Sequence, residues 1–266
     1  MLRILPALDL ASLGLSWLPC LETAHRLGVR TVEIDLRRQL PWRELGETAF
    51  REIRKQLSDR NLRASVVRFR TKKGYDDDQD LDRRVEGTKT AMRFAAALGA
   101  KFLTNRLGVL PRELENASRE NDQENPLIVE VLTDLIRYSE REGVILTGEL
   151  GEDSGEDLAR LLKLLPDGGV GVDLDPGLLA AFGHSPQQAA QVVGNALTVV
   201  HATDAVSGGG PGQRRLAPLG TGGVDYSELL GVLEKTGYQG HFFVRAVGDE
   251  QPVAEVQRAI EFLRRI

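Results

Sequence analysis

The chain repeats one structural unit along its whole length: an amphipathic segment, a turn, and a short β-rich run. The unit recurs about every 30 to 40 residues, as in proteins whose strands alternate with helices. Glycine lies just before four of the later β-rich runs, at Gly28, Gly99, Gly143 and Gly237, where a left-handed residue commonly ends a helix. Alternating strands and helices form parallel sheets with crossover helices. We therefore predict an α/β protein.

The number of β-rich runs separates two α/β architectures. Eight runs are found: Arg3–Leu8, Thr31–Ile34, Arg63–Phe69, Lys101–Thr104, Val144–Glu149, Gly169–Leu174, Leu197–His201 and His241–Arg245. An open doubly wound sheet usually carries a glycine-rich phosphate loop after its first strand, but residues 9–14 read DLASLG. We predict a single (β/α)8 TIM barrel that spans residues 1–266.

Local signals agree with this organisation. Three segments have the spacing of helix N-caps: Ser154 with Asp157, Ser185-Pro186 with Gln188, and Asp225 with Glu228. The longest stretches that we expect to be irregular are Asn105–Asn125 and Ala205–Gly223. A glycine cluster at residues 208–212 is either a flap over the barrel mouth or an ordinary surface loop.

Composition excludes several classes of protein. The formal net charge is −5 and the basic residues are scattered, so we expect no nucleic-acid partner. No uninterrupted apolar run is long enough to span a membrane. Cys20 is the only cysteine, which is typical of a reducing compartment, and we expect a cytoplasmic protein. The oligomeric state stays open, with a homo-oligomer as one alternative.

Polar residues gather where the predicted strands end. In this fold, catalytic residues come from the carboxyl ends of several strands. The candidates are Glu33, Arg68, Asn105 or Arg106, Glu149, Asp173, Asp175, His201 and Arg245. Charged groups at nearly every strand end are costly in a partly dehydrated mouth unless they serve a site. The alternative is a salt-bridged cap of the barrel.

Four segments of the second half resemble one superfamily. They are residues 169–177 (GVGVDLDPG), 199–205 (VVHATDA), 218–226 (PLGTGGVDY) and 237–245 (GYQGHFFVR). In this order they resemble the xylose-isomerase-like sugar isomerases and epimerases. The equivalent motifs of that family read strand–Asp, His-x-x-Asp, Pro-Leu-Gly-x-Gly-x-Val-Asp, and Gly-Tyr-x-Gly-strand–Glu. The first half of the chain resembles the family mainly in its rhythm of strands.

The resemblance implies a metal site made of Glu149, Asp175, His201 and the residue at position 245. Carboxylates with one imidazole suit Mn²⁺ or Mg²⁺. Such a cation would bind adjacent oxygens of a hydroxy-ketone sugar and stabilise an enediolate, while Glu149 moves the proton. Our candidates for contact with the substrate are Glu33, Arg68, Arg106 and Asp204, of which Asp204 matches the His-x-x-Asp motif of the family.

Position 245 departs from the family pattern, because it is arginine where glutamate is expected. A guanidinium stays protonated, cannot ligate a metal and repels a divalent cation, so the Mn²⁺ or Mg²⁺ site is either weakened or lost. One hypothesis is that Arg245 takes the volume of the cation and pairs with Glu149 and Asp175. Arg68 and Arg106 either recognise a carboxylate or phosphate of the ligand, or point outward as loop charges.

Two other candidates keep structural alternatives. Glu33 either contacts substrate or forms a buried salt bridge with an arginine. Asp204 bonds a sugar hydroxyl, orients His201, or caps a turn. A related family of DNA-repair endonucleases uses a histidine-rich zinc site, whereas only His201 of the four histidines here is well placed.

Two functions follow from these residues. The first is a sugar or sugar-derivative isomerase or epimerase relative, with Glu149 and Arg245 as catalytic groups and an altered metal site. The second is a non-catalytic barrel that binds a polyol, sugar acid or sugar phosphate as a sensor or partner.

Overall fold

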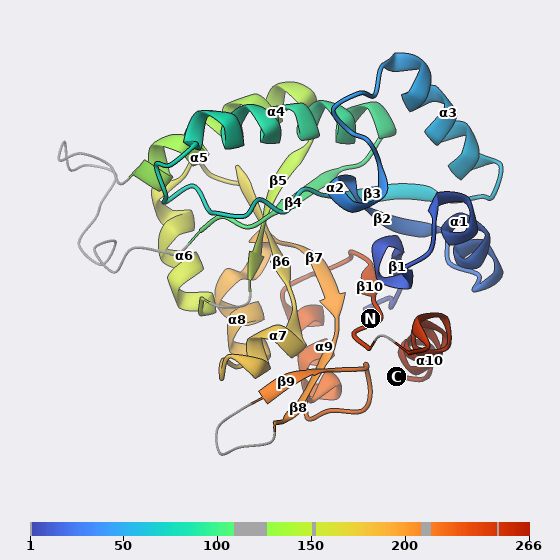
Figure 1. The fold of residues 1–266 in the computed structure, drawn as a ribbon. Helices are drawn as coiled ribbons and strands as arrows, with labels where there is room; N and C mark the ends of the chain where they lie inside the picture. The colour runs from blue at the N-terminus through green and yellow to red at the C-terminus, as the bar shows by residue number, and fades with distance from the viewer. Residues whose placement is uncertain (1, 109–126, 151–152, 209–213, 249) are drawn as a thin grey trace.

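Eight parallel strands close into a barrel in the computed structural model, which describes residues 2–108, 127–150, 153–208, 214–248 and 250–266 (Figure 1). The ring order is β1-β10-β7-β6-β5-β4-β3-β2, and β1 pairs with both β10 and β2. The barrel strands are β1 (Pro6–Asp9), β2 (Thr31–Asp35), β3 (Arg63–Arg68), β4 (Phe102–Asn105), β5 (Ile145–Leu150), β6 (Val170–Leu174), β7 (Leu197–Ala202) and β10 (Phe242–Val244). The predicted (β/α)8 TIM barrel is confirmed.

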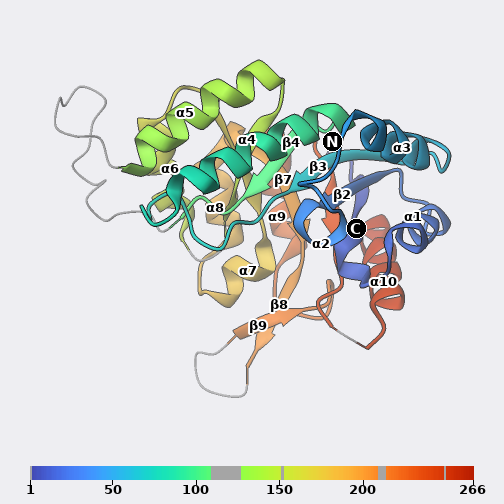
Figure 2. The same ribbon diagram turned by 45° about the horizontal axis from the view of Figure 1, so that its top comes forward.

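Helices surround the strands, with α4 beside α5 on one side and α1 beside α10 on another (Figures 1 and 2). Among the described segments, no helix has the length and apolar character needed to cross a membrane. The helices are α1 (Trp17–Arg26), α2 (Leu36–Gln39), α3 (Glu47–Ser58), α4 (Leu81–Leu98), α5 (Leu127–Glu142), α6 (Gly155–Leu164), α7 (Pro176–Ala181), α8 (Pro186–Val193), α9 (Tyr226–Lys235) and α10 (Pro252–Arg265), with short 3₁₀ turns at Leu10–Leu13 and Gly194–Ala196.

The helix caps and the left-handed glycines that the sequence predicts are present in the structure. Ser154 and Asp157 form a capping box at the start of α6, and the side chains of Ser185 and Asp225 accept backbone N–H groups at the starts of α8 and α9. The four glycines before strands have φ values of 69° to 74°. These caps and left-handed turns are confirmed.

The segment after β7 differs from the prediction of irregular structure over Ala205–Gly223. Asp204–Ser207 (β8) and Arg214–Ala217 (β9) form a two-stranded antiparallel pair outside the barrel. These strands are four residues each, too short to give a clear alternating pattern in the sequence. Most of Asn105–Asn125 and of the glycine cluster at 208–212 lies outside the described residues.

A small apolar layer inside the barrel sets the floor of the mouth. It consists of Ala7, Val66, Val199 and Phe243, all buried, with Phe102 packed against them. Side chains two residues apart in a strand point to the same face. The next inward positions are therefore polar: Asp9 on β1, Arg68 on β3, His201 on β7, and Arg245 just after β10.

Two irregularities in strand pairing help to aim these side chains. Between β2 and β3 the register shifts, so that Ser65 has no partner and Glu33 lies opposite Val66. Between β6 and β7 it shifts again, which leaves Thr198 unpaired and places Asp173 opposite Val199. An extra residue in one strand re-aims the side chains that follow it, and such bulges are common beside functional sites.

Candidate active site at the carboxyl ends of the strands

A cavity of about 620 Å³ opens at the carboxyl ends of the barrel strands. Its lining brings together seven of the residues that the sequence predicted: Arg68, Arg106, Glu149, Asp173, Asp175, His201 and Arg245. Glu33 and Asp204, which are both described, are not part of the lining. The predicted convergence of side chains from the last four strands is thus present.

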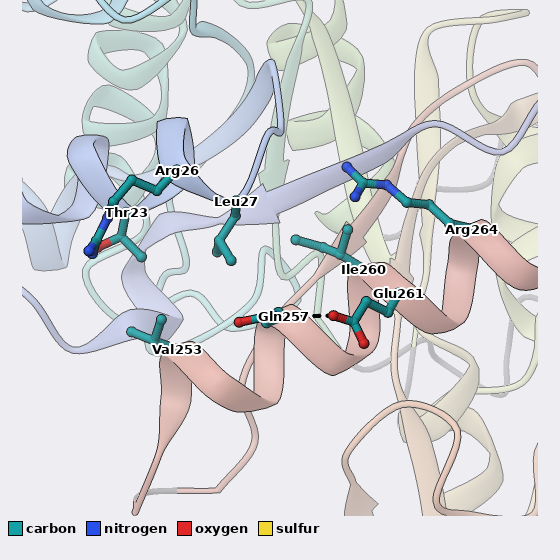
Figure 3. Close-up of a pocket in the computed structure, with 8 residues that line it drawn as sticks. All are labelled: Thr23, Arg26, Leu27, Val253, Gln257, Ile260, Glu261 and Arg264. Carbon is teal, nitrogen blue, oxygen red and sulfur yellow. Dashed lines mark hydrogen bonds between the residues drawn. The ribbon is translucent and has the colours of Figure 1, made fainter.

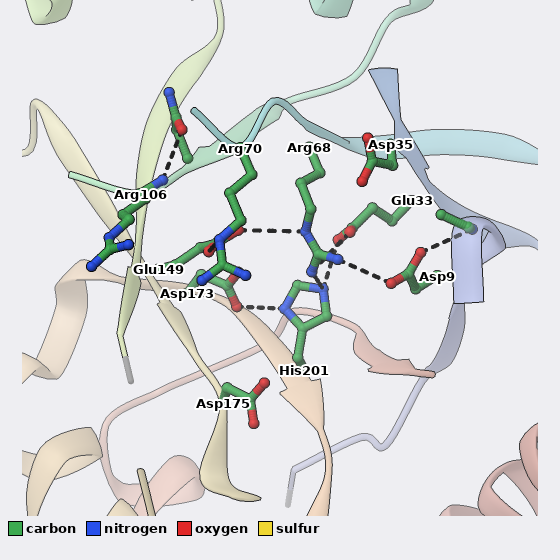
Figure 4. Close-up of polar contacts among 12 residues, drawn as sticks. Asp9, Glu33, Asp35, Arg68, Arg70, Arg106, Glu149, Asp173, Asp175 and His201 are labelled. Atoms are coloured by element: carbon green, nitrogen blue, oxygen red, sulfur yellow. Dashed lines mark hydrogen bonds and ion pairs between the residues drawn. The ribbon is translucent and has the colours of Figure 1, made fainter. Parts of the chain in front are cut away.

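The guanidinium of Arg68 lies at the centre of the deepest cluster (Figure 4). Its Nη1 is 3.0 Å from Oδ2 of Asp9, and its Nη2 is 3.0 Å from Oε1 of Glu33. Its Nε is 3.5 Å from Oε1 of Glu149, whose other oxygen lies 3.3 Å from Nε of Arg70. Arg68 therefore points into the barrel, and the alternative of an outward loop charge is wrong for this residue.

His201 links two carboxylates across the floor. Its Nδ1 is 2.6 Å from Oδ1 of Asp173, and its Nε2 is 2.7 Å from Oε2 of Glu33. Burial lowers the pKa of His201, but the charges of Asp173 and Glu33 outweigh this effect and raise the pKa to about 10. The ring is therefore an imidazolium that donates one hydrogen bond to each carboxylate.

Two cations consequently share Glu33. Nη2 of Arg68 lies 2.9 Å from Nε2 of His201, and both nitrogens carry hydrogen when the ring is protonated. The two nitrogens are then both donors, which do not hydrogen-bond to each other and are held side by side by the carboxylate of Glu33. Burial opposes ionisation of Glu33, but the charges of Arg68 and His201 outweigh it and lower its pKa. The pKa of Arg68 is raised, because the surrounding carboxylates outweigh its burial.

Glu149 is less enclosed than the rest of the cluster, since 18% of its side chain is exposed compared with none for Glu33. Burial raises the pKa of Glu149, and the charges of Arg68 and Arg70 offset that rise only in part. A carboxylate with a raised pKa accepts and returns protons more readily near neutral pH. Glu149 also lines the cavity, beside the space that a ligand would occupy.

Arg245 lies across the mouth and pairs with Asp175. The carboxylate of Asp175 also accepts hydrogen bonds from the Thr203 hydroxyl and from the backbone N–H of Leu178, 2.9 Å away, at the start of α7. The predicted pairing of Arg245 with Asp175 is present. Its predicted pairing with Glu149 is wrong, because Glu149 pairs with Arg68 and Arg70 instead.

Asp204 organises the loop between β9 and α9. Its oxygens accept the backbone N–H groups of Ala205, Gly220, Gly222 and Val224 at 2.8 to 3.2 Å, and the residue is 1% exposed. All four contacts are local or structural, which favours the turn-capping alternative over contact with a sugar. The buried ion pair with Arg68 likewise matches the structural alternative for Glu33.

Asn105 serves the loop after β3. Its Oδ1 accepts the backbone N–H of Thr71 at 3.0 Å, and its Nδ2 donates to the hydroxyl of Tyr75 at 2.8 Å. Between the two residues predicted as alternatives at the end of β4, Asn105 is thus a structural residue and Arg106 lines the cavity.

Several charged residues of the cavity were not singled out from the sequence, among them Asp9, Arg37, Arg38 and Arg70. Asp9 ends β1 two residues after the inward-facing Ala7, so the parity of the first strand would have identified it. Arg70 follows β3 in a loop, where the sequence carries no such signal. Asp173, one of the candidates at the strand ends, bonds His201 as described above.

The three metal ligands implied by the resemblance already have cationic or hydrogen-bonding partners. Glu149 pairs with two arginines, Asp175 pairs with Arg245, and Nε2 of His201 faces Arg68. A divalent cation about 4 Å from a guanidinium would be repelled by about 8 kcal/mol at an effective dielectric constant of about 20. Within the described ranges, no group of three or more His, Cys, Asp or Glu residues is arranged to hold a metal ion. The residues present do not fit a metal in this arrangement.

A second hollow, of about 370 Å³, lies on the outside of the barrel. Figure 3 shows that its lining comes from α10 and the end of α1, with Gln257 and Glu261 hydrogen-bonded to each other along α10. It lies away from the strand ends, and its polar groups do not converge on one point. The candidate site is therefore the cavity at the barrel mouth.

Comparison with known proteins agrees with the fold. No curated protein sequence is significantly similar to this chain. A xylose isomerase domain protein from Planctomyces limnophilus matches 99% of this chain and 95% of its own, with 20% identity and a TM-score of 0.80. A xylose isomerase-like TIM barrel protein from Mycobacterium smegmatis in complex with magnesium matches 100% and 96%, with 18% identity and a TM-score of 0.76.

A D-psicose 3-epimerase with D-tagatose from Clostridium cellulolyticum H10 matches 99% of both chains, with 15% identity and a TM-score of 0.76. At these identities the structural likeness establishes the fold alone. The sequence comparison goes further, because residues 21–266 match the family described as "Xylose isomerase-like TIM barrel". The chain therefore belongs to the xylose isomerase-like TIM barrel family.

Proposed function

We propose that this protein binds a sugar acid, sugar phosphate or related sugar in the mouth of the barrel and isomerises it by proton transfer, with Glu149 as the base. The observation that carries the proposal is the position of Glu149: its carboxylate reaches the cavity between two guanidinium groups, at the carboxyl end of β5. Catalytic groups of barrels with this architecture lie at that end.

The reaction that these groups support is the transfer of one proton between neighbouring carbons, together with one hydroxyl proton between their oxygens. The carboxylate of Glu149 removes the proton from a hydroxyl-bearing carbon next to a carbonyl, and the electron pair moves to form an enediolate oxygen. The proton of the neighbouring hydroxyl passes to this oxygen, and the same carboxylate returns the first proton to the former carbonyl carbon, which completes an aldose–ketose type of isomerisation. Arginine hydrogen-bond donors that face the developing oxyanion stabilise it electrostatically, and Arg245 lines the cavity across from Glu149.

The replacement at position 245 favours isomerisation over epimerisation. An epimerase that works on both faces of an enediolate needs two bases, one on each side. Arg245 stays protonated and cannot be the second base. A single carboxylate that removes and returns the proton on one face is sufficient for isomerisation.

The rim of the cavity favours an anionic ligand. Arg37 and Arg38 on α2, together with Arg70 and Arg106, line the outer part of the cavity, and the first two are exposed. Arginine binds carboxylates and phosphates through paired N–H donors. These four side chains support a sugar acid or sugar phosphate rather than a neutral sugar.

The second candidate function is a non-catalytic binder of the same ligands. The observation that favours it is the internal neutralisation of the site, in which Glu149 and His201 are both held by ion pairs. A binding protein would use the cavity and the arginine rim without proton transfer. The two functions differ in one measurable event, exchange of a carbon-bound hydrogen with solvent.

The test is incubation in deuterated water with a panel of ketoses, sugar acids and sugar phosphates. We expect deuterium at a single carbon with wild-type protein, and loss of that label in Glu149→Gln. The matched control is Glu130→Gln, at an exposed position on α5, which should label as wild type does. Ligand-dependent thermal stabilisation without any label would support the binder instead. Neither label nor stabilisation with any compound would refute both functions.

A further inference from the structure

We propose that Arg68 is the built-in cation of this site, and that its guanidinium holds together the acidic groups that would otherwise gather around a metal ion. Arg68 reaches the centre from β3, and its partners come from β1, β2, β5 and β7. This inference concerns the charge balance of the cluster and does not depend on the proposed isomerisation.

The contacts of Arg68 resemble those of a central ion. Each terminal nitrogen lies about 3 Å from a buried acidic oxygen, at Asp9 and Glu33, while Nε faces Glu149 at 3.5 Å. Only 11% of the Arg68 side chain is exposed. Buried carboxylates need compensating positive charge, and Arg68 is the one described group that pairs with all three of these. His201 adds charge beside Glu33, and Arg70 adds it beside Glu149.

The groups around Arg68 have the chemistry of metal ligands. Carboxylates and one imidazole are donors that suit Mn²⁺ and similar divalent cations. Asp173 binds Nδ1 of His201, and a carboxylate in that position commonly orients a histidine whose other nitrogen binds a metal. Nε2 of His201 donates to Glu33 at 2.7 Å and lies 2.9 Å from Nη2 of Arg68. The donors are therefore arranged around the guanidinium.

Two buried polar atoms of the cluster around Arg68 lack a hydrogen-bond partner within the described ranges. Oε1 of Glu33 and Nε of Arg68 are buried but make no hydrogen bond among the described residues, although both take part in ion pairs. This oxygen of Glu33 is thus held by its ion pair with Arg68, whereas the other oxygen accepts a hydrogen bond from His201. Without the guanidinium, Oε1 of Glu33 would be a buried, negatively charged oxygen that has lost its ion pair.

Removal of Arg68 should therefore create a metal site that wild-type protein lacks. After treatment with a chelator, wild type should bind no stoichiometric Mn²⁺, measured by calorimetry and by metal analysis. Arg68→Ala should bind one Mn²⁺ per chain with an affinity more than about tenfold above that of wild type. Mn²⁺ should also raise the melting temperature of Arg68→Ala and leave that of wild type unchanged.

Two control variants separate this effect from a general loss of positive charge. Arg70→Ala removes an arginine that contacts only Glu149 among the cluster's carboxylates and is 56% exposed, so it should not gain the site. Arg68→Lys keeps the charge at the centre and should also not gain it. Adding His201→Gln to Arg68→Ala should abolish the gained binding.

The outcomes divide as follows. Stoichiometric Mn²⁺ in wild type, or an Arg68→Ala protein that folds and binds Mn²⁺ no better than wild type, overturns the proposal. If Arg68→Ala folds only with Mn²⁺, the proposal is supported, and Arg68→Met tests the same point with a side chain of similar length. If neither variant folds under any condition, wild type decides: an unchanged melting temperature with chelator and with Mn²⁺ supports the built-in cation, and a change refutes it.

Discussion

Replacement of Asp204 by alanine tests whether this residue supports the loop or contacts substrate. Its carboxylate accepts four backbone N–H groups, from Ala205, Gly220, Gly222 and Val224. Three of these bonds join β8 to the segment after β9. At about 1.5 kcal/mol for each hydrogen bond to a charged acceptor, their loss costs about 4 kcal/mol. For a protein of this size, that corresponds to a fall in melting temperature of about 10 °C.

Thermal unfolding of wild type and Asp204→Ala measures this difference, and Asp225→Ala is the matched control. Asp225 lies in the same region, and its side chain accepts one N–H, that of Glu228, as an N-cap. Its replacement should cost about 1 kcal/mol, or about 2 °C. If Asp204→Ala melts within about 2 °C of wild type and loses affinity for ligand, the structural assignment of Asp204 is wrong and the substrate role is right.

Three further predictions concern single positions. Gly222→Ala should lower the melting temperature by several degrees, because an added Cβ would lie 2.2 Å from a carboxylate oxygen of Asp204. Gly223→Ala should leave the melting temperature unchanged, because the nearest atom to its Cβ would be 3.9 Å away. Equal effects of the two variants would contradict this packing. Tyr75→Phe should cost about 1 to 3 kcal/mol in urea unfolding, because it leaves the buried amide of Asn105 without its acceptor; a neutral result would refute that bond. Burial raises the pKa of the Cys20 thiol to about 11, so in folded protein it should stay protonated at pH 8 and react with a thiol reagent only after unfolding; fast reaction in native buffer would contradict this.

The proposed chemistry and the built-in cation constrain each other. Arg68 contacts both the proposed base, Glu149, and the buried pair formed by Glu33 and His201. Deuterium exchange by wild-type protein after chelation would support both ideas together. Exchange that requires Mn²⁺ would refute the built-in cation and leave the role of Glu149 intact.

The strand segments along the chain and the turns between them could be predicted from the sequence because both depend on local chemistry. Glycines such as Gly99 and Gly237 adopt positive φ at the ends of helices, and Ser154 caps its own helix within three residues. The identity of Arg245 was also informative by itself, because a guanidinium cannot ligate a metal in any fold. These properties do not require knowledge of distant contacts.

The tertiary structure decided which charges meet. The sequence placed Glu149 with Arg245, whereas the barrel brings Glu149 to Arg68, which lies on β3, two strands from β5 in the ring. Unpaired residues in β3 and β7 help to set the direction of the Arg68 and His201 side chains. No local sequence pattern predicts these unpaired residues. Closure of the barrel joins side chains from strands more than a hundred residues apart, so the pairing of charges depends on register and strand order, which local sequence does not encode.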